Sequence, residues 1–309
     1  MPGFPEALRP ALLASRGRSR DVSRRWAAGA EVRALRTAFA DCPLDGPGPA
    51  ADRAEQLLAN GDWAAALLDP LLAALDKDPL FEPPLRARRD GLRTGLVLHD
   101  CAAVSLVASV SHAAALARAP EPRTIALPGR MTVTRVLRSG GAHWRRWHVE
   151  EEDRCIALPP LPLAEGAVYR SDGRNEARLL SGARSDVAVL TATIRAGAAP
   201  LLREFDLATR RLCRIADGDD RSSRAGMLLA LLRASGRTDA GPCFEAATCD
   251  AAHQLRWAAM REWLMLDAGA ALPRLAQMAE QDPHAQVRAA ARRTLETLAA
   301  RQEPEPCPA

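Results

Sequence analysis

The stretch Thr132-Val133-Thr134-Arg135-Val136-Leu137 lies in a longer segment, Arg123 to Ile215, that decides the fold. β-Branched and aromatic residues recur through this segment, and Gly, Pro and Asp turns separate them, a pattern typical of short strands. Further strands are expected at Trp144 to Val149, Ala167 to Arg170 and Asp186 to Ile194. Because no helical pattern intervenes, the sequence predicts an antiparallel β core.

Turns and upstream strands extend this core. Ser139-Gly140-Gly141 and Ser171 to Asn175 are predicted hairpin turns, since Gly and Asn adopt positive φ at little cost. Phe205 to Cys213 is predicted as a further hairpin. Gly95 to Asp100 and Cys101 to Val110 favour two earlier strands, the second with apolar residues at a period of two. The predicted β domain therefore covers 91–218. Its strands and turns resemble a cupin or jelly-roll domain, which implies a sandwich or small barrel.

Residues 1–90 are predicted to form an N-terminal helical region. Val22 to Ala40 favours a broken helix whose buried face carries Trp26, Val32, Leu35 and Phe39. Ala50 to Leu75 favours two helices, with Gly61 ending the first and Asp62 capping the second. A basic arm for an acidic partner is the alternative interpretation of the Arg-rich first residues.

The C-terminal residues repeat with an offset of 32. Asp250 aligns with Asp282 and Arg256 with Arg288, and the apolar positions between and after them align as well. Such self-similarity predicts stacked helical hairpins over 219–300. The segment Asp282 to Ala290 resembles the second helix of a HEAT-type repeat. In that family the Asp caps the helix and the Arg reaches a neighbouring repeat. Residues 301–309 are predicted to be a disordered tail.

Composition restricts the class of protein. The chain has 309 residues, 48% hydrophobic and 26% charged, as in a folded soluble protein. Its net charge of +4 is too small to indicate a nucleic-acid partner, and the dominance of Arg over its single lysine is typical of a GC-rich bacterial genome.

The seven cysteines form no CxxC pair, which favours reduced thiols. With no apolar stretch long enough to span a bilayer, we expect a cytoplasmic protein without membrane partners.

One pair of residues carries a metal hypothesis. His148 and Glu150 lie two apart on a predicted strand, so both project from one face. A His-x-Glu pair with a distant His forms the facial triad of non-heme iron enzymes. The cupin resemblance implies a different spacing, with a second histidine two residues from the first. The alternative to an Fe(II) or other divalent metal site is an exposed strand end.

Other residues are candidates for binding. Trp144 and Arg146 belong to an aromatic-basic strand that covers a ligand or seals a junction. On the repeat, Trp257, Arg256 and Arg288 are candidate contacts to a protein partner. A nucleophile cluster at His99-Asp100-Cys101 is weighed against a buried thiol beside a hydrogen-bonded histidine.

We therefore predict an α+β protein in which an antiparallel cupin-like β sandwich or barrel is flanked by N-terminal helices and C-terminal HEAT-like hairpins. The predicted function is non-enzymatic: a regulatory or accessory protein that binds another protein, with a β domain that holds a small ligand or acts as a scaffold. No cofactor is predicted. The alternative is a metal-dependent cupin-type oxygenase that uses His148 and Glu150.

Overall fold

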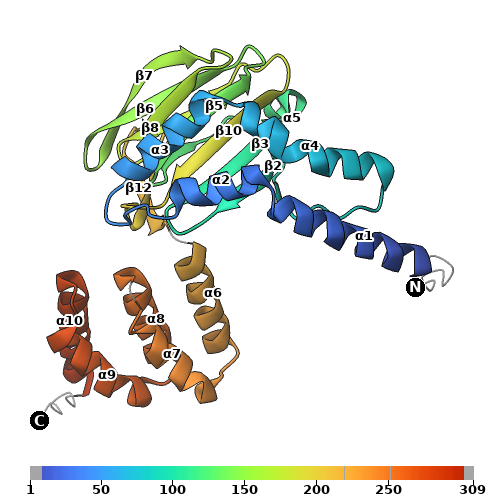
Figure 1. Cartoon of the computed structure of the whole chain (residues 1–309). Helices are drawn as coiled ribbons and strands as arrows, with labels where there is room; N and C mark the ends of the chain where they lie inside the picture. Colours follow the sequence, from blue (N-terminus) through green and yellow to red (C-terminus); the bar gives the residue numbers. More distant parts are fainter. Residues whose placement is uncertain (1–8, 219, 251, 303–309) are drawn as a thin grey trace, which may run out of the picture. The chain divides into compact units, whose positions relative to one another are not determined.

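The computed structural model describes residues 9–218, 220–250 and 252–302 (Figure 1). The chain divides into two compact units, Met1–Ile215 and Ala216–Ala309. The first combines the N-terminal helices with the β strands, and the second consists mainly of helices. The predicted α+β class, with antiparallel sheets between N-terminal and C-terminal helices, is confirmed.

A six-stranded antiparallel sheet forms the centre of the first unit, in the order β1-β2-β3-β10-β5-β8. Its strands are β1 (Arg86–Arg89), β2 (Arg93–Asp100), β3 (Val104–Ser111), β5 (Met131–Arg138), β8 (Val168–Asp172) and β10 (Val187–Ile194). Side chains alternate between the two faces of a strand. On β10, Leu190, Ala192 and Ile194 are buried in the main core, whereas Val189 and Thr191 line the opposite face.

The remaining strands form the other half of the sandwich, in two three-stranded sheets ordered β7-β6-β9 and β12-β11-β4. They are β4 (Thr124–Leu127), β6 (His143–Glu151), β7 (Arg154–Pro162), β9 (Glu176–Ser181), β11 (Leu201–Asp206) and β12 (Leu212–Asp217). Within the eight strands β3 to β10, β3 pairs with β10, β5 with β8 and β6 with β7, while β4 lies beside β9. This nested pairing of first with last is the topology of a jelly roll.

The predicted hairpin turns connect these strands. Ser139-Gly140-Gly141 joins β5 to β6, and both glycines have positive φ. A Cβ on Gly140 would lie 2.1 Å from the carbonyl oxygen of Ser185, so only glycine fits there. The turns after β8 and β11 also fall where they were predicted.

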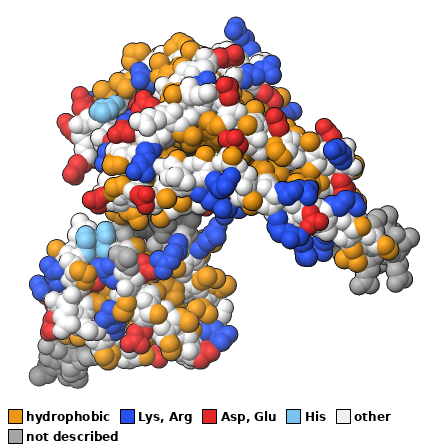
Figure 2. Space-filling model, in the orientation of Figure 1, with side chains coloured by type: hydrophobic (Ala, Val, Ile, Leu, Met, Phe, Trp, Pro, Cys, Tyr) orange, Lys and Arg blue, Asp and Glu red, His pale blue; other side chains and the backbone are white. Residues whose placement is uncertain are grey.

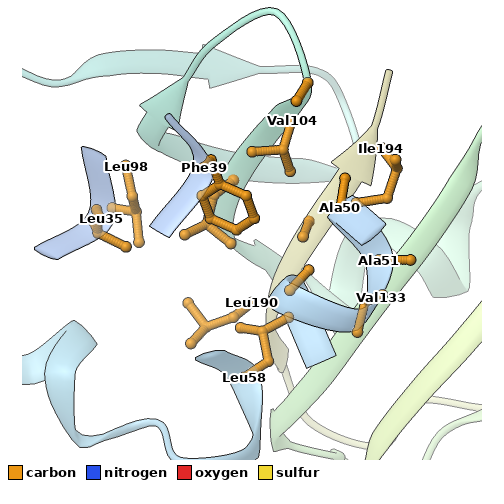
Figure 3. Packing of buried hydrophobic residues seen from close by; sticks show 14 of the residues in the cluster. Leu35, Phe39, Ala50, Ala51, Leu58, Leu98, Val104, Val133, Leu190 and Ile194 are labelled. Atoms are coloured by element: carbon orange, nitrogen blue, oxygen red, sulfur yellow. The ribbon is translucent and has the colours of Figure 1, made fainter. Parts of the chain in front are cut away.

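Helices cover the outer face of the six-stranded sheet (Figure 1). They are α1 (Arg9–Ala27), α2 (Ala30–Phe39), α3 (Gly48–Ala59) and α4 (Asp62–Lys77), and a short α5 (Ala113–Arg118) follows β3. Figure 3 shows how Leu35 and Phe39 of α2 and Leu58 of α3 meet the apolar face of the strands. Burial of this surface is the main stabilising term of the unit, at about 25 cal/mol per Å² of apolar area.

Two details of the predicted N-terminal region are corrected. The N-terminal helices share one core with the strands, within the first compact unit. The predicted broken helix starts before Val22, since α1 begins at Arg9, and its break falls at Gly29. Asp62 is not the cap of α4: Gly61 is the N-cap residue, no side chain caps the helix, and the backbone N–H of Asp62 donates to Oδ1 of Asn60. Trp26 is partly buried, and Val32, Leu35 and Phe39 are buried as expected.

The second unit contains α6 (Asp220–Ala234), η2 (Thr238–Ala240), α7 (Gly241–Ala247), α8 (His253–Leu266), α9 (Ala268–Gln281) and α10 (Ala285–Gln302). Its core joins residues of all five α helices, among them Phe244, Met260, Leu275 and Met278. Helix α10 continues through Gln302, so the predicted tail starts too early. Residues 303–309 of that tail lie outside the described residues.

Arginine and aspartate link successive helices of this unit. Arg256 donates from Nε and Nη2 to the two carboxylate oxygens of Asp282, at 2.8 and 2.7 Å. The contacts recur at the 32-residue offset: Arg256 donates to the carbonyl of Asp250, and Arg288 to the carbonyl of Asp282. Each of these aspartates also accepts a backbone N–H two residues further on. The 32-residue repeat in the sequence therefore corresponds to hydrogen bonds that recur with the same spacing in the structure.

No helix in the described part of the chain is both long and apolar enough to cross a membrane.

The contact between α3 and the sheet gives a first prediction. Nη1 of Arg135, on β5, donates to the last carbonyls of α3, those of Leu58 (3.0 Å) and Ala59 (2.6 Å). Arg135→Met leaves these carbonyls without that donor and should destabilise the unit by about 1–3 kcal/mol. Urea unfolding should show the loss, and hydrogen exchange should place it in α3. Arg138→Met, exposed on the same strand, serves as control, and an equal loss there would refute the role of Arg135.

The buried ion pair of the second unit gives another prediction. The side chains of Arg256 and Asp282 are 8% and 2% exposed. Burial raises the pKa of Asp282, but hydrogen bonds from Arg256 and from the backbone of His284 outweigh it and hold that pKa below its ordinary value. The carboxylate thus contributes stability above the ordinary pKa of an aspartate, and this contribution is lost as pH falls through the lowered value.

Asp282→Asn should cost about 3–5 kcal/mol at pH 7, because the Arg256 charge stays buried without its partner. Below about pH 4 the difference in unfolding free energy between the variant and the parent should shrink. Urea unfolding followed by the fluorescence of Trp257 and Trp263 would measure both effects. Asp239→Asn, in an exposed pair with Arg237, should change little. A pH-independent difference would contradict the assigned titration.

Candidate ligand-binding cup

A cup opens between the two halves of the jelly roll, on the face of the six-stranded sheet that the helices do not cover. Its volume is about 250 Å³. Hydroxyl, aliphatic, aromatic and arginine side chains line it: Arg93, Ser109, Ser111, Thr132, Thr134, Trp144, Leu163, Arg178, Leu180, Val187, Val189 and Thr191.

The hydroxyl groups of the cup follow from strand alternation. Ser109 and Ser111 lie two apart on β3, and Thr132 and Thr134 lie two apart on β5, so each pair faces the same side. Oγ1 of Thr134 is 3.3 Å from Oγ1 of Thr191 on the neighbouring strand. Because a hydroxyl both donates and accepts hydrogen bonds, this wall can bind polar groups of either kind.

The opposite wall carries a charge cluster. Arg178 donates to Glu176 from Nε and Nη2, at 3.4 and 3.2 Å, and Nη1 of Arg146 lies 3.6 Å from the same carboxylate. The side chains of Arg178 and Glu176 are only 14% and 17% exposed. Two guanidinium groups share one carboxylate, so the cluster of these three residues carries one positive charge in excess. Ser171 of β8 also donates to Glu176 and thereby joins the two sheets.

Trp144 connects the charge cluster to the apolar part of the cup. The guanidinium carbon of Arg178 lies 4.7 Å from the centre of the indole ring, a cation–π contact. The edge of Trp144 also meets Tyr169, with ring centres 5.0 Å apart. These contacts fix the position of the Arg178 side chain. Arginine held in this way favours a carboxylate or phosphate as its ligand.

The predicted metal pair lies elsewhere. His148 and Glu150 on β6 are both exposed. In the parts of the chain that the structure describes, no three His, Cys, Asp or Glu side chains come together as metal ligands. The geometry therefore gives the metal hypothesis no third ligand, and it favours the alternative of an exposed strand end.

The nucleophile cluster is not assembled either. His99 stacks on Phe39, with ring centres 5.8 Å apart, and burial lowers its pKa. Asp100 binds Arg86 and Arg195 rather than His99. The alternative of a buried thiol beside a hydrogen-bonded histidine fits only in part, because Cys101 is half-buried and the buried Nε2 of His99 has no hydrogen-bond partner in the described part of the chain.

Of the predicted interaction residues, two belong to the cup region and three to the second unit. Trp144 lines the cup, and Arg146 contributes to its charge cluster. Trp257 packs partly against the helical core. Arg256 is buried against Asp282, so it is not available on the surface, and Arg288 is bound to backbone carbonyls.

Sequence reasoning missed Arg178, Glu176 and the hydroxyl groups. A signal was present, because Thr132 and Thr134 alternate with Val133 and Arg135 on a strand of the core. The sequence could not show which of the two faces the helices cover, since that depends on tertiary packing.

Comparisons with known proteins give only distant structural similarities. Neither a protein-family model nor a curated protein matches this sequence. Solved structures similar to it include a cupin domain from Bordetella pertussis, with 12% identity, a TM-score of 0.24, and coverage of 35% of this chain and 99% of that one. Ectoine synthase from P. lautus has 15% identity, a TM-score of 0.25, and coverage of 36% and 69%. A DMSP lyase structure has 15% identity, a TM-score of 0.28, and coverage of 60% and 95%. At these values the similarities carry no argument about activity.

The shared carboxylate gives a prediction. Glu176→Gln leaves Arg146 and Arg178 as two like charges in a partly buried position, so the midpoint of thermal unfolding should fall. Added sulfate should restore more stability in the variant than in the parent, because an anion can replace the lost carboxylate. Glu150→Gln, exposed on β6, is the control. Equal responses to sulfate in parent and variant would contradict an anion site here.

Proposed function

We propose that this chain is a non-enzymatic binding protein with a regulatory or accessory role, whose jelly-roll cup holds a small anionic organic molecule. The chemistry of the cup carries the proposal. One wall offers the Arg178 guanidinium, the other a set of hydroxyl groups, and Trp144 supplies an apolar surface between them. Small-ligand sites combine apolar walls with a few placed polar groups in this way.

Charge favours an anion over a neutral ligand. A carboxylate can accept two parallel hydrogen bonds from a guanidinium, which gives both affinity and orientation. Glu176 and the carbonyl of Arg170 engage Nε and Nη2 of Arg178, so its Nη1 and the excess positive charge of the cluster remain for the ligand. We therefore expect a small hydroxy- or dicarboxylate, with its polar groups toward Thr132, Thr134 and Thr191.

The cupin-type oxygenase that uses His148 and Glu150 is the weaker proposal. A non-heme metal site requires at least three protein or substrate ligands around open positions. Both side chains are exposed, and they are not among the residues that line the cup. The described residues that do line it include no His, Cys, Asp or Glu.

The second unit is, in this proposal, a HEAT-like array that binds another protein. The Arg256–Asp282 bridge and the backbone contacts repeated at the 32-residue offset support the assignment. Stacked helical hairpins present extended surfaces to partners. Trp257 and Arg288 stay predicted contacts to such a partner.

A binding experiment tests the cup. Citrate, succinate and inorganic phosphate would be titrated into the full chain by calorimetry, with thermal shift as a second readout. We expect saturable binding of at least one carboxylate, weakened about tenfold or more by Arg178→Met, the size of a lost charge-assisted hydrogen bond. Arg174→Met serves as the matched control, because Arg174 pairs with Asp172 and does not line the cup. No binding by the parent, or equal binding by Arg178→Met, would refute the proposal.

A further inference from the structure

A second hollow lies among the N-terminal helices, apart from the cup. Helices α1, α2 and α4 line an open groove of about 510 Å³, roughly twice the volume of the cup. No residue lines both. The groove residues are mostly apolar or small: Val22, Arg25, Trp26, Gly29, Ala30, Glu31, Val32, Ala66, Leu67, Pro70, Ala73, Ala74 and Lys77.

Small residues create the hollow and larger ones fix its walls. Alanines at 66, 73 and 74 leave space along α4 that longer side chains would fill. The indole Nε1 of Trp26 donates to the carbonyl of Leu67 at 2.8 Å, which holds this ring against α4. Gly29 forms the turn between α1 and α2, where a Cβ would approach the Trp26 carbonyl oxygen to 2.9 Å. The groove is thus held open by fixed contacts rather than by loose packing.

The polar groups of the groove are sorted along its length. Arg18 binds Asp78, and Trp26 binds Leu67, so α1 and α4 run antiparallel (Figure 1). Lys77 therefore lies at the end near Val22. Glu31 lies toward the other end, in the first turn of α2.

Positive charge is available at the Lys77 end. Lys77 is the only lysine of the chain, and neither it nor Arg25 forms an ion pair with any carboxylate in the described ranges. Figure 2 shows Lys and Arg side chains along the N-terminal helices, with Asp and Glu side chains among them. Pro70, inside α4, leaves one backbone carbonyl beside the groove without its usual helical donor. It has no N–H, so the Ala66 carbonyl receives no helical hydrogen bond from it.

We infer that this groove binds a small amphipathic carboxylate, with its aliphatic tail between Trp26, Val32 and Leu67 and its carboxylate at Lys77. The volume lies in the range of small-molecule pockets, about 300–1,000 Å³. The groove is open to solvent along one side, where Ala66, Pro70 and Ala73 of α4 are exposed, and Val32 and Leu67 form its buried floor. Lys77, which forms no ion pair in the described ranges, matches a single anionic head group, and Glu31 toward the other end opposes binding in the reverse orientation.

Decanoate and decan-1-ol, below their aggregation concentrations, are the probes. Calorimetry on the full chain should show saturable decanoate binding, and the fluorescence of Trp26 should change with the same midpoint. Trp26→Phe should remove most of the fluorescence change, which assigns it to this groove. Decanol should bind several-fold more weakly, because it lacks the charge that Lys77 attracts.

Two matched pairs of variants locate the site. Ala73→Leu fills the groove and should weaken decanoate binding by tenfold or more, whereas Ala65→Leu, exposed on the same helix but outside the groove, should not. Lys77→Met should weaken decanoate by about threefold to fivefold, the worth of an exposed ion pair, and leave decanol unchanged. Arg20→Met is its control, since Arg20 is exposed on α1 and does not line the groove.

Each contrary result overturns a defined part of the inference. Absence of saturable decanoate binding, or equal effects of Ala73→Leu and Ala65→Leu, would remove the groove as a ligand site. Equal affinity for decanoate and decanol would refute the proposed role of the carboxylate in binding. Because no residue is shared with the cup, Arg178→Met should leave decanoate binding intact, so the two proposals can fail separately.

Discussion

The first unit depends on burial of one face of its six-stranded sheet beneath the N-terminal helices. Side chains of β3, β5 and β10 alternate, and the apolar half of each strand meets α2, α3 and α4 (Figure 3). A slip of one residue in any strand would exchange the buried and open faces. The burial therefore fixes the register of the sheet, and the register in turn decides which residues face the cup.

The cup is the consequence of what this packing leaves uncovered. Thr132 and Thr134 cannot enter the helical core without losing hydrogen bonds, so they occupy the face that opens between the sheets. Across from them, two arginines are tolerated in a partly buried place because Glu176 and the Trp144 ring compensate their charge. Desolvation would otherwise be too costly for a pair of guanidinium groups. The same compensation positions Arg178 to receive an anion.

In the second unit, a buried ion pair sets the order of the helices. Arg256 is buried, yet its donors meet the Asp282 carboxylate and the Asp250 carbonyl. Such a pair is sensitive to geometry, because removing either partner leaves a buried charge. It specifies which helix lies beside which, while the apolar residues around Met260 and Leu275 supply most of the burial. Specificity and stability thus come from different residues in this unit.

The sequence alone determined the class of fold and the positions of most elements. Local signals were sufficient for the hairpin turn at Gly140 and Gly141, for the strand alternation, and for the 32-residue repeat, because each depends on residues close together in the chain. The union of helices and strands in one core, the exposure of His148 and Glu150, and the meeting of Arg178 with Glu176, Arg146 and Trp144 were decided by tertiary structure. The face that a strand buries is set by its distant neighbours. A site assembled from β2, β3, β5, β6, β9 and β10 therefore cannot be located from the pattern of any one of these strands.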